Sequence, residues 1–117
     1  MLNYSIKDIA KIINAKCIGH FDCTIKSVSI DSRSVVGSEN VLFFALVGQN
    51  HDGHRYISEL YNYLGVKAFV VSNDEDYLSQ FPNASFLKVS NTLDALQKFA
   101  TYHRSLFTYP VVGITGS

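Results

Sequence analysis

The sequence has little of several features that mark whole classes of protein. No run approaches the roughly 18 consecutive apolar residues of a membrane-spanning helix, and the opening residues 1–8 lack the basic, then apolar layout of a signal peptide. Ten basic side chains balance ten acidic ones, and Lys and Arg are not clustered. These absences argue against a membrane span, secretion, nucleic-acid binding and binding to an anionic membrane surface, and they favour a cytoplasmic location.

Cysteine and the patterns of common catalytic or metal sites are also scarce. Cys17 and Cys23 are the two cysteines, and in a chain with ample apolar content they are best explained as reduced thiols. His51 and His54 stand three apart, but no third ligand follows at a recognisable spacing, which disfavours a metal site. There is no Gly-x-Ser-x-Gly elbow and no Cys-His signature, so we predict no catalytic residue.

What the chain does have is apolar and aromatic content, with 47% hydrophobic residues, seven Tyr and eight Phe in 117 residues. That is enough for one domain with a core. Apolar periodicity predicts helices over about 6–14 and 56–64 and a long helix capped by Asn91 or Thr92. The apolar run 41–47 predicts a strand buried on both faces, at the centre of the sheet. Further strands are expected at 16–20, 24–30, 66–72 and 85–89, the first two as a hairpin, with a loop or short helix over 73–83.

This alternation of helices and buried strands predicts an α/β fold: a single domain with a mixed, mostly parallel sheet flanked by helices. Two polar clusters interrupt the apolar plan, Ile30-Asp31-Ser32-Arg33 at the end of a strand and Gly48 to His54 directly after the central strand. Open α/β sheets bind ligands at the ends of their strands. If the two strands are neighbours, both clusters border one pocket.

The chemistry of these clusters suits a phosphorylated nucleotide. Ser32 can donate a hydroxyl to a phosphate oxygen, Arg33 can make a bidentate contact, and Gln49, Asn50 and His51 can read a base or ribose. The alternative for each cluster is an ordinary surface turn, since Asx turns and Asp-Gly pairs are common turn signals.

The chain ends on an apolar strand followed by a glycine turn, Val111 to Ser117. Gly113-Ile114-Thr115-Gly116 reads like the first half of a phosphate-binding loop that stops before its lysine. An ordinary junction between a strand and a turn is the alternative.

Taken together, several motifs in order resemble the N-terminal region of Mur ligases, the ATP-dependent enzymes that extend the peptide of UDP-N-acetylmuramic acid. The resemblance covers about residue 24 to the end. The segments that carry it are Ile30-Asp31-Ser32-Arg33, Leu42-Phe43-Phe44-Ala45-Leu46, the loop from Gly48 to Ile57, Gly65 to Val71, and Gly113 to Ser117.

The resemblance implies a UDP-substrate-binding domain over residues 1–110, followed by the first strand and the start of the ATP loop of a central domain over 111–117. It implies that Ile30, Ser32, Arg33, Gln49, Asn50 and His51 bind UDP-N-acetylmuramoyl peptide. It also implies that Gly116 and Ser117 begin the ATP loop. Asp52 belongs to the motif and shapes the loop more than it touches ligand.

For the parent enzyme, the resemblance implies ATP and Mg²⁺ as cofactors, with the central ATPase and C-terminal domains as partners within the same chain. This fragment alone is expected to be inactive and to hold no cofactor. The form of residues 42–46 and 58–64 favours the MurF branch, which adds D-alanyl-D-alanine, and suggests a fusion to alanine racemase.

Two alternatives remain open. The MurE branch, which adds the third amino acid, is close. The departure from the family pattern at Gln49, which is His in some MurE members, leaves the uracil contact open. A stand-alone nucleotide-sugar-binding module without catalysis is the other alternative.

Overall fold

The computed structural model describes residues 4–19, 24–30, 40–50, 52–73 and 76–105. For residues 104 and 105 it describes the backbone alone. In chain order, the elements are β1 (Tyr4–Ser5), α1 (Ile6–Ile13), β2 (Lys16–Gly19), β3 (Thr24–Ile25), β4 (Ser27–Ser29), β5 (Val41–Phe44), the 3-10 helix η3 (Gly53–Tyr56), α2 (Ile57–Leu64), β6 (Ala68–Val71), α3 (Tyr77–Gln80), β7 (Ser85–Lys88) and α4 (Thr92–Ser105).

The described strands form a five-stranded sheet in the order β2-β7-β6-β5-β4, and β1 pairs separately with β3. The pairs β4–β5, β5–β6 and β6–β7 are parallel, and β2 runs antiparallel to β7. The prediction of an α/β domain with a mixed, mostly parallel sheet flanked by helices is therefore confirmed.

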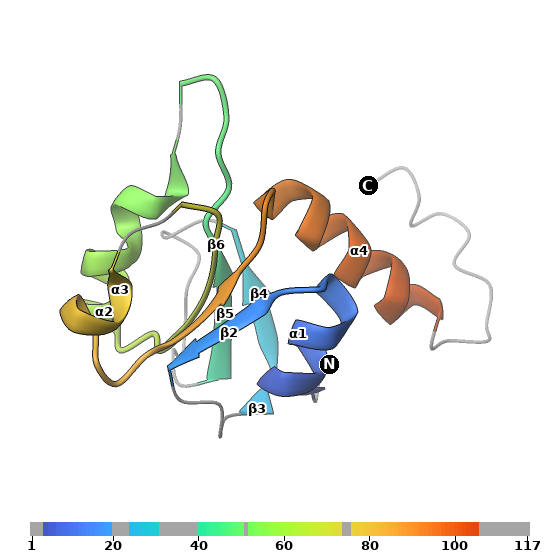
Figure 1. The fold of residues 1–117 in the computed structure, drawn as a ribbon, viewed down its shortest axis with the longest axis horizontal. Helices are drawn as coiled ribbons and strands as arrows, with labels where there is room; N and C mark the ends of the chain where they lie inside the picture. Colours follow the sequence, from blue (N-terminus) through green and yellow to red (C-terminus); the bar gives the residue numbers. More distant parts are fainter. Residues whose placement is uncertain (1–3, 20–23, 31–39, 51, 74–75, 106–117) are drawn as a thin grey trace.

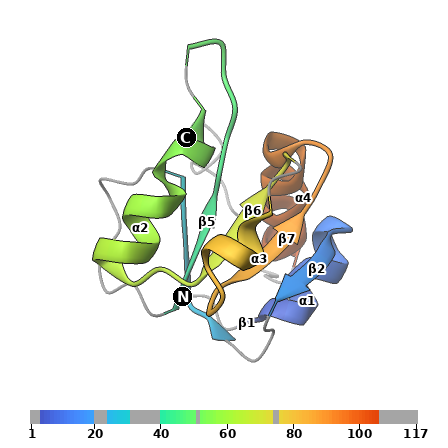
Figure 2. The same cartoon turned by 60° about the vertical axis from the view of Figure 1, so that its left-hand side comes forward.

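Helices cover both faces of this sheet, as Figures 1 and 2 show. Alternate side chains along β5 enter different cores, because successive residues of a strand point to opposite faces. Leu42 and Phe44 join α1 and α4 in one core, while Phe43, together with Ala45 just after the strand, joins α2 and α3 in the other. All four residues of β5 are buried, as the unbroken apolar run predicts for a strand covered on both sides.

The predicted helices begin and end close to their capping residues. The Ser5 hydroxyl accepts a hydrogen bond from the Asp8 backbone N–H at 3.1 Å, which satisfies a donor left open at the start of α1. Gly65 adopts a left-handed conformation (φ 72°) just after α2, as expected for a glycine that ends a helix. The Asn91 side chain accepts from the Asp94 N–H at 2.9 Å, so Asn91 caps α4.

Three local predictions need correction. The expected hairpin of 16–20 with 24–30 does not form, because β2 pairs with β7 at one edge of the sheet and β4 with β5 at the other. The centre of the sheet is β6, and β5 lies next to it. Helical spacing predicts one apolar side of α4 formed by Leu93, Leu96, Phe99, Ala100 and His103. Leu93 is 47% exposed and Ala100 is also exposed, because the helix turns its Ala95 and Phe99 side towards the core.

The predicted strand limits were longer than the observed ones. The short helix α3 occupies part of segment 73–83, where a loop or short helix was expected. The last predicted strand, from Val111, lies outside the described residues, as does Cys23. Cys17 is a free, exposed thiol.

Candidate functional site

Two neighbouring parallel strands deliver the predicted site segments to one edge of the sheet. β4 and β5 pair in parallel, with Ser29 opposite Phe43, so their carboxyl ends point the same way. Ile30 follows β4 directly, and the loop containing Gln49 and Asn50 follows β5. This is the edge at which open α/β sheets hold ligands.

The described site residues are accessible there. Ile30 is 47% exposed, so its side chain is accessible to a ligand, although a single exposed apolar residue does not by itself mark a site. Gln49 and Asn50 are also exposed. The segment after β5 projects beyond the carboxyl edge of the sheet before the chain returns to η3 (Figures 1 and 2).

Five predicted site residues lie outside the described part of the chain. They are Ser32, Arg33, His51, Gly116 and Ser117. Their roles stay predictions.

The base of the projecting loop is tightly closed. Val47 and Asp52 form an isolated antiparallel bridge, and the Gly53 N–H donates to the Leu46 carbonyl at 2.7 Å. Gly53 lies so close to the end of β5 that a Cβ there would stand 2.9 Å from the Leu46 nitrogen and 3.0 Å from the Ala45 Cα. Only a residue without a side chain fits this approach.

Asp52 and His54 complete that closure. Asp52 caps η3, with its Oδ1 accepting from the His54 backbone N–H at 3.0 Å. The same oxygen lies 2.6 Å from Nδ1 of the His54 ring. On the other side of the ring, Nε2 accepts from the Ser72 N–H at 3.0 Å, just beyond β6.

Sequence reasoning considered His54 only as a metal ligand and missed this role. Both ring nitrogens already have partners within the protein, so the ring has no free lone pair for a metal. In the described ranges, no group of three or more His, Cys, Asp or Glu is placed to hold a metal ion. The Asp-Gly-His order hints at a helix cap, but nothing in the sequence points to Ser72.

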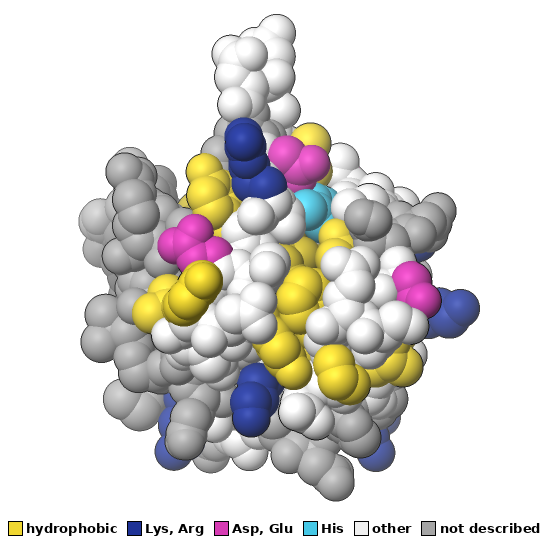
Figure 3. All heavy atoms as spheres, turned by 90° about the vertical axis from the view of Figure 1, so that its left-hand side faces the viewer, with side chains coloured by type: hydrophobic (Ala, Val, Ile, Leu, Met, Phe, Trp, Pro, Cys, Tyr) yellow, Lys and Arg dark blue, Asp and Glu magenta, His cyan; other side chains and the backbone are white. Residues whose placement is uncertain are grey.

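A cavity of about 250 Å³ lies beside this closure, between α2 and α3. Figure 3 shows this face, with the projecting segment above it and hydrophobic side chains gathered in the furrow below. The residues that line the cavity are mostly polar or aromatic: Asp52, His54, Arg55, Ile57, Ser58, Asn73, Tyr77, Gln80 and Phe81.

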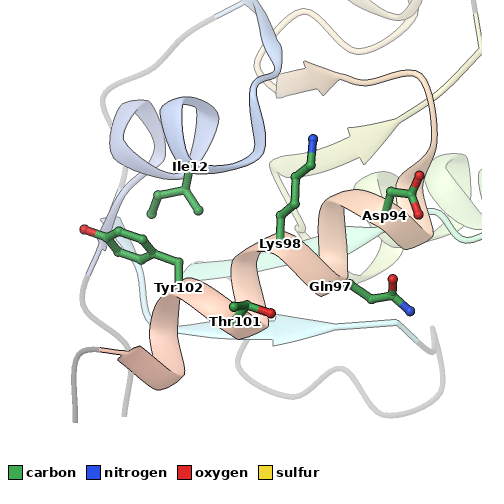
Figure 4. A pocket seen from close by; sticks show the side chains of 6 residues that line it. All are labelled: Ile12, Asp94, Gln97, Lys98, Thr101 and Tyr102. Atoms are coloured by element: carbon green, nitrogen blue, oxygen red, sulfur yellow. The ribbon is translucent and has the colours of Figure 1, made fainter. Parts of the chain in front are cut away.

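A larger cavity, of about 650 Å³, is an open groove between α1 and α4 on the other face of the sheet. Figure 4 shows Ile12 of α1 above the α4 side chains that line it, with Asp94 and Lys98 one turn apart. None of the described site residues, which are Ile30, Gln49 and Asn50, lines this groove. Size alone therefore does not mark the site.

Among the described helices, none is both long and apolar enough to cross a membrane.

The fold and the edge together define a class: an α/β domain with exposed loops at the carboxyl ends of neighbouring parallel strands, where open α/β sheets hold ligands. The sequence profile described as "Mur ligase family, catalytic domain" matches residues 24–104. The chain belongs to the Mur ligase family, and the resemblance inferred from the motifs is confirmed.

Individual relatives agree with this assignment. The UDP-N-acetylmuramoyl-tripeptide--D-alanyl-D-alanine ligase of Synechocystis sp. is 38% identical over 96 residues, covering 82% of this chain and 20% of the relative. The UDP-N-acetylmuramoyl-L-alanyl-D-glutamate--2,6-diaminopimelate ligase of Clostridioides difficile is 32% identical over 108 residues, covering 91% of this chain and 20% of the relative.

A solved structure supports the fold. MurF from Acinetobacter baumannii matches with a TM-score of 0.75 at 20% identity, over 89% of this chain and 22% of that protein. The chain spans about a fifth to a quarter of the length of the curated relatives that it matches.

Proposed function

We propose that this chain is the domain that holds UDP-N-acetylmuramoyl peptide in an ATP-dependent peptidoglycan-precursor ligase. The branch we favour is MurF, which adds D-alanyl-D-alanine to the UDP-N-acetylmuramoyl tripeptide. The observation that carries the proposal is the parallel pairing of β4 with β5, which delivers Ile30 and the loop of Gln49 and Asn50 to one edge. The Synechocystis relative is a UDP-N-acetylmuramoyl-tripeptide--D-alanyl-D-alanine ligase, which supports the choice of branch.

The side chains at this edge suit the proposed ligand. The amides of Gln49 and Asn50 each offer a donor and an acceptor, which is what recognition of a base or ribose requires. Ile30 adds an exposed apolar surface against which a ring can pack. Ser32, Arg33 and His51 would complete the site, with Arg33 suited to bidentate contact with the diphosphate.

This domain would anchor the substrate and would not catalyse. Binding energy from a remote group can hold a reacting group in place without entering the chemistry. Under the proposal, residues 1–110 form the UDP-substrate domain and residues 111–117 begin the central domain. The central ATPase and C-terminal domains of the parent would supply the rest of the cleft, in the cytoplasm.

In the parent, ATP and Mg²⁺ would supply the phosphoryl group that activates the carboxylate at the end of the peptide. Gly116 and Ser117, which would begin the ATP loop, lie outside the described residues. That activation therefore rests on the family resemblance alone, and we expect the 117-residue chain by itself to be inactive.

The MurE branch is the second candidate, because the Clostridioides difficile relative that adds 2,6-diaminopimelate matches over 91% of this chain. Both branches bind a UDP-N-acetylmuramoyl peptide, so a domain at the UDP end discriminates weakly between them. The product of the full-length enzyme with each amine substrate decides the branch.

An amide NMR titration of the 117-residue chain with UDP-N-acetylmuramoyl tripeptide tests the proposed site. We expect weak binding, with shifts at Ile30, Gln49 and Asn50 and none at Ile12 or Lys98 in the groove between α1 and α4. Saturating ligand without change at the first three would reject the site. UDP-N-acetylglucosamine lacks the peptide, so a titration with it serves as the control that separates contacts to the UDP-sugar from contacts to the peptide.

The coding sequence beyond codon 117 tests the parent enzyme. Asn-Gly-Lys-Thr followed by a central domain would support the ligase, and a pyridoxal-phosphate racemase domain further on would support the fused form. A stop codon directly after Ser117 would favour a stand-alone binding module.

A further inference from the structure

The imidazole of His54 joins the base of the projecting loop to the end of a central strand. Its side chain is buried, with only 6% of its surface exposed. On one side Nδ1 lies 2.6 Å from Asp52 Oδ1, and on the other Nε2 lies 3.0 Å from the backbone nitrogen of Ser72. The ring therefore bridges the residue that closes the loop and the carboxyl end of β6.

These two contacts determine which ring nitrogen carries the proton. A backbone N–H can only donate, so the Ser72 N–H requires Nε2 to be an acceptor. The remaining proton of a neutral ring must then be on Nδ1, where it is donated to the Asp52 carboxylate. The partner of one nitrogen thus sets the state of the other.

Asp52 is the point at which this bridge reaches the loop. Its Oδ1 accepts from both the ring and the backbone N–H of His54, and its backbone pairs with Val47 across the loop. Because Asp52 is mostly exposed, at 54% for the side chain, water competes for its carboxylate. The buried ring, hydrogen-bonded to the sheet, gives that carboxylate a fixed partner.

We propose that His54, as the neutral Nδ1–H tautomer, is a positioning residue that holds the loop of Gln49 and Asn50 in place through Asp52. The inference rests on the proposed function, since that loop is the proposed substrate contact. His54 itself does not touch the substrate. Its effect is to reduce the conformational freedom that the loop would lose on binding, and pre-organisation of this kind strengthens affinity.

The ligand-free protein tests the bridge directly. Long-range ¹H–¹⁵N NMR of the His54 ring in the 117-residue chain should show a protonated Nδ1 and an unprotonated Nε2. The Ser72 amide should be protected from hydrogen exchange. A ring protonated at Nε2 would place two donors face to face and would overturn the proposal.

Four variants test positioning against a merely structural role. Asp52→Ala and His54→Ala each remove one link, and the double variant removes both. Asp52→Asn keeps an oxygen acceptor at the same place, so this conservative variant should retain the hydrogen bonds that Asp52→Ala removes. Asn91→Ala is the matched control, because it removes a side-chain acceptor that caps α4 at 2.9 Å, on the helix that packs in the other core.

In titrations with UDP-N-acetylmuramoyl tripeptide, we expect Asp52→Ala and His54→Ala each to weaken binding about tenfold, the effect of losing a charge-assisted hydrogen bond. The double variant should be no weaker than the single ones, because both act through one chain of contacts. Asp52→Asn should stay within about threefold of the wild type, and Asn91→Ala should bind as the wild type does. If His54→Ala fails to fold, the two Asp52 variants still decide the result.

The two proposals fail differently. If the wild type binds and both alanine variants bind equally well, the positioning role is overturned and the proposed function stands. If the wild type does not bind at saturating ligand, the proposed function is overturned and the positioning role with it. Equal loss in Asp52→Asn and Asp52→Ala would assign the effect to the charge of Asp52 and overturn the role of the bridge.

Discussion

The phenol oxygen of Tyr4 lies 3.0 Å from Nδ1 of His103, so a hydrogen bond joins residues 99 positions apart in the sequence. The Tyr4 ring also meets Phe99 edge-on, with centroids 5.3 Å apart. β1 is therefore tied to the C-terminal half of α4. Phe99 belongs to the core that α1 and α4 share, and Tyr4 packs against that core.

Removing this hydrogen bond should destabilise the domain. We expect Tyr4→Phe to lower the free energy of unfolding by about 1 kcal/mol, because the ring contacts stay while the hydrogen bond to His103 is lost. Urea denaturation measures the change. Tyr63→Phe, at a position that is 83% exposed, is the matched control and should have little effect. Equal losses of unfolding free energy in Tyr4→Phe and Tyr63→Phe would show that the hydrogen bond from Tyr4 to His103 does not stabilise the domain.

The same tyrosine should make stability fall at alkaline pH. Burial, and then the neighbouring Tyr102, raise the pKa of the Tyr4 phenol above its ordinary value. The folded state thus favours the neutral phenol, and this contribution is complete below the unfolded pKa of about 10. It is lost as the pH rises through the higher folded pKa.

Urea denaturation of the wild type and Tyr4→Phe across this alkaline range gives the test. We expect the wild type to lose more stability than the variant as the pH rises above about 10. Parallel curves for the two proteins would show that Tyr4 does not carry the effect.

Gly53 should tolerate no side chain. In Gly53→Ala the new Cβ would stand 2.9 Å from the Leu46 nitrogen and 3.0 Å from the Ala45 Cα, and both are backbone atoms at the end of β5. We expect a loss of about 1–3 kcal/mol in unfolding free energy, as for other overpacked sites. Gly48→Ala, at an exposed position in the same loop, is the comparison. A Gly53→Ala protein as stable as the wild type would contradict the observed packing.

Asn50 provides a test of the proposed ligand contact without disturbing the fold. Asn50→Ala, at an exposed position, should weaken binding of UDP-N-acetylmuramoyl tripeptide about threefold to tenfold, the range expected for one lost hydrogen bond. Calorimetry or the amide titration measures the affinity. Asn62→Ala on α2, where the side chain bonds only to Ser58 among the described contacts, should bind as the wild type does. Unchanged affinity in Asn50→Ala would remove it from the site.

Local patterns predicted the helices well, because their signals lie within a few residues of one another. Ser5 caps α1 through Asp8, and Gly65 ends α2 in a left-handed conformation. The apolar run at β5 predicted burial on both faces, and all four of its residues are buried. The motifs in order also identified the family, through the buried strands β5 and β6 together with the polar segments that follow β4 and β5.

Strand pairing was less predictable. The alternating pattern of residues 16–30 fits a hairpin as well as it fits two separate edge strands. The choice depends on β7, nearly 70 residues beyond β2, which accepts β2 as its antiparallel neighbour. Such a partner is set by the packing of both cores around the sheet, and a local pattern does not record it.

By itself, the sequence determined the segments of α1, α2 and α4, the buried strands, the family, and the edge-loop residues Ile30, Gln49 and Asn50 as site candidates. Only the tertiary structure decided the order of the strands, the contact of Tyr4 with His103, and the bridge from Asp52 through His54 to Ser72. The physical reason is the distance along the sequence over which each interaction acts. Caps and periodicity act over a few residues, whereas hydrogen bonds between distant segments exist only after the sheet has brought those segments together.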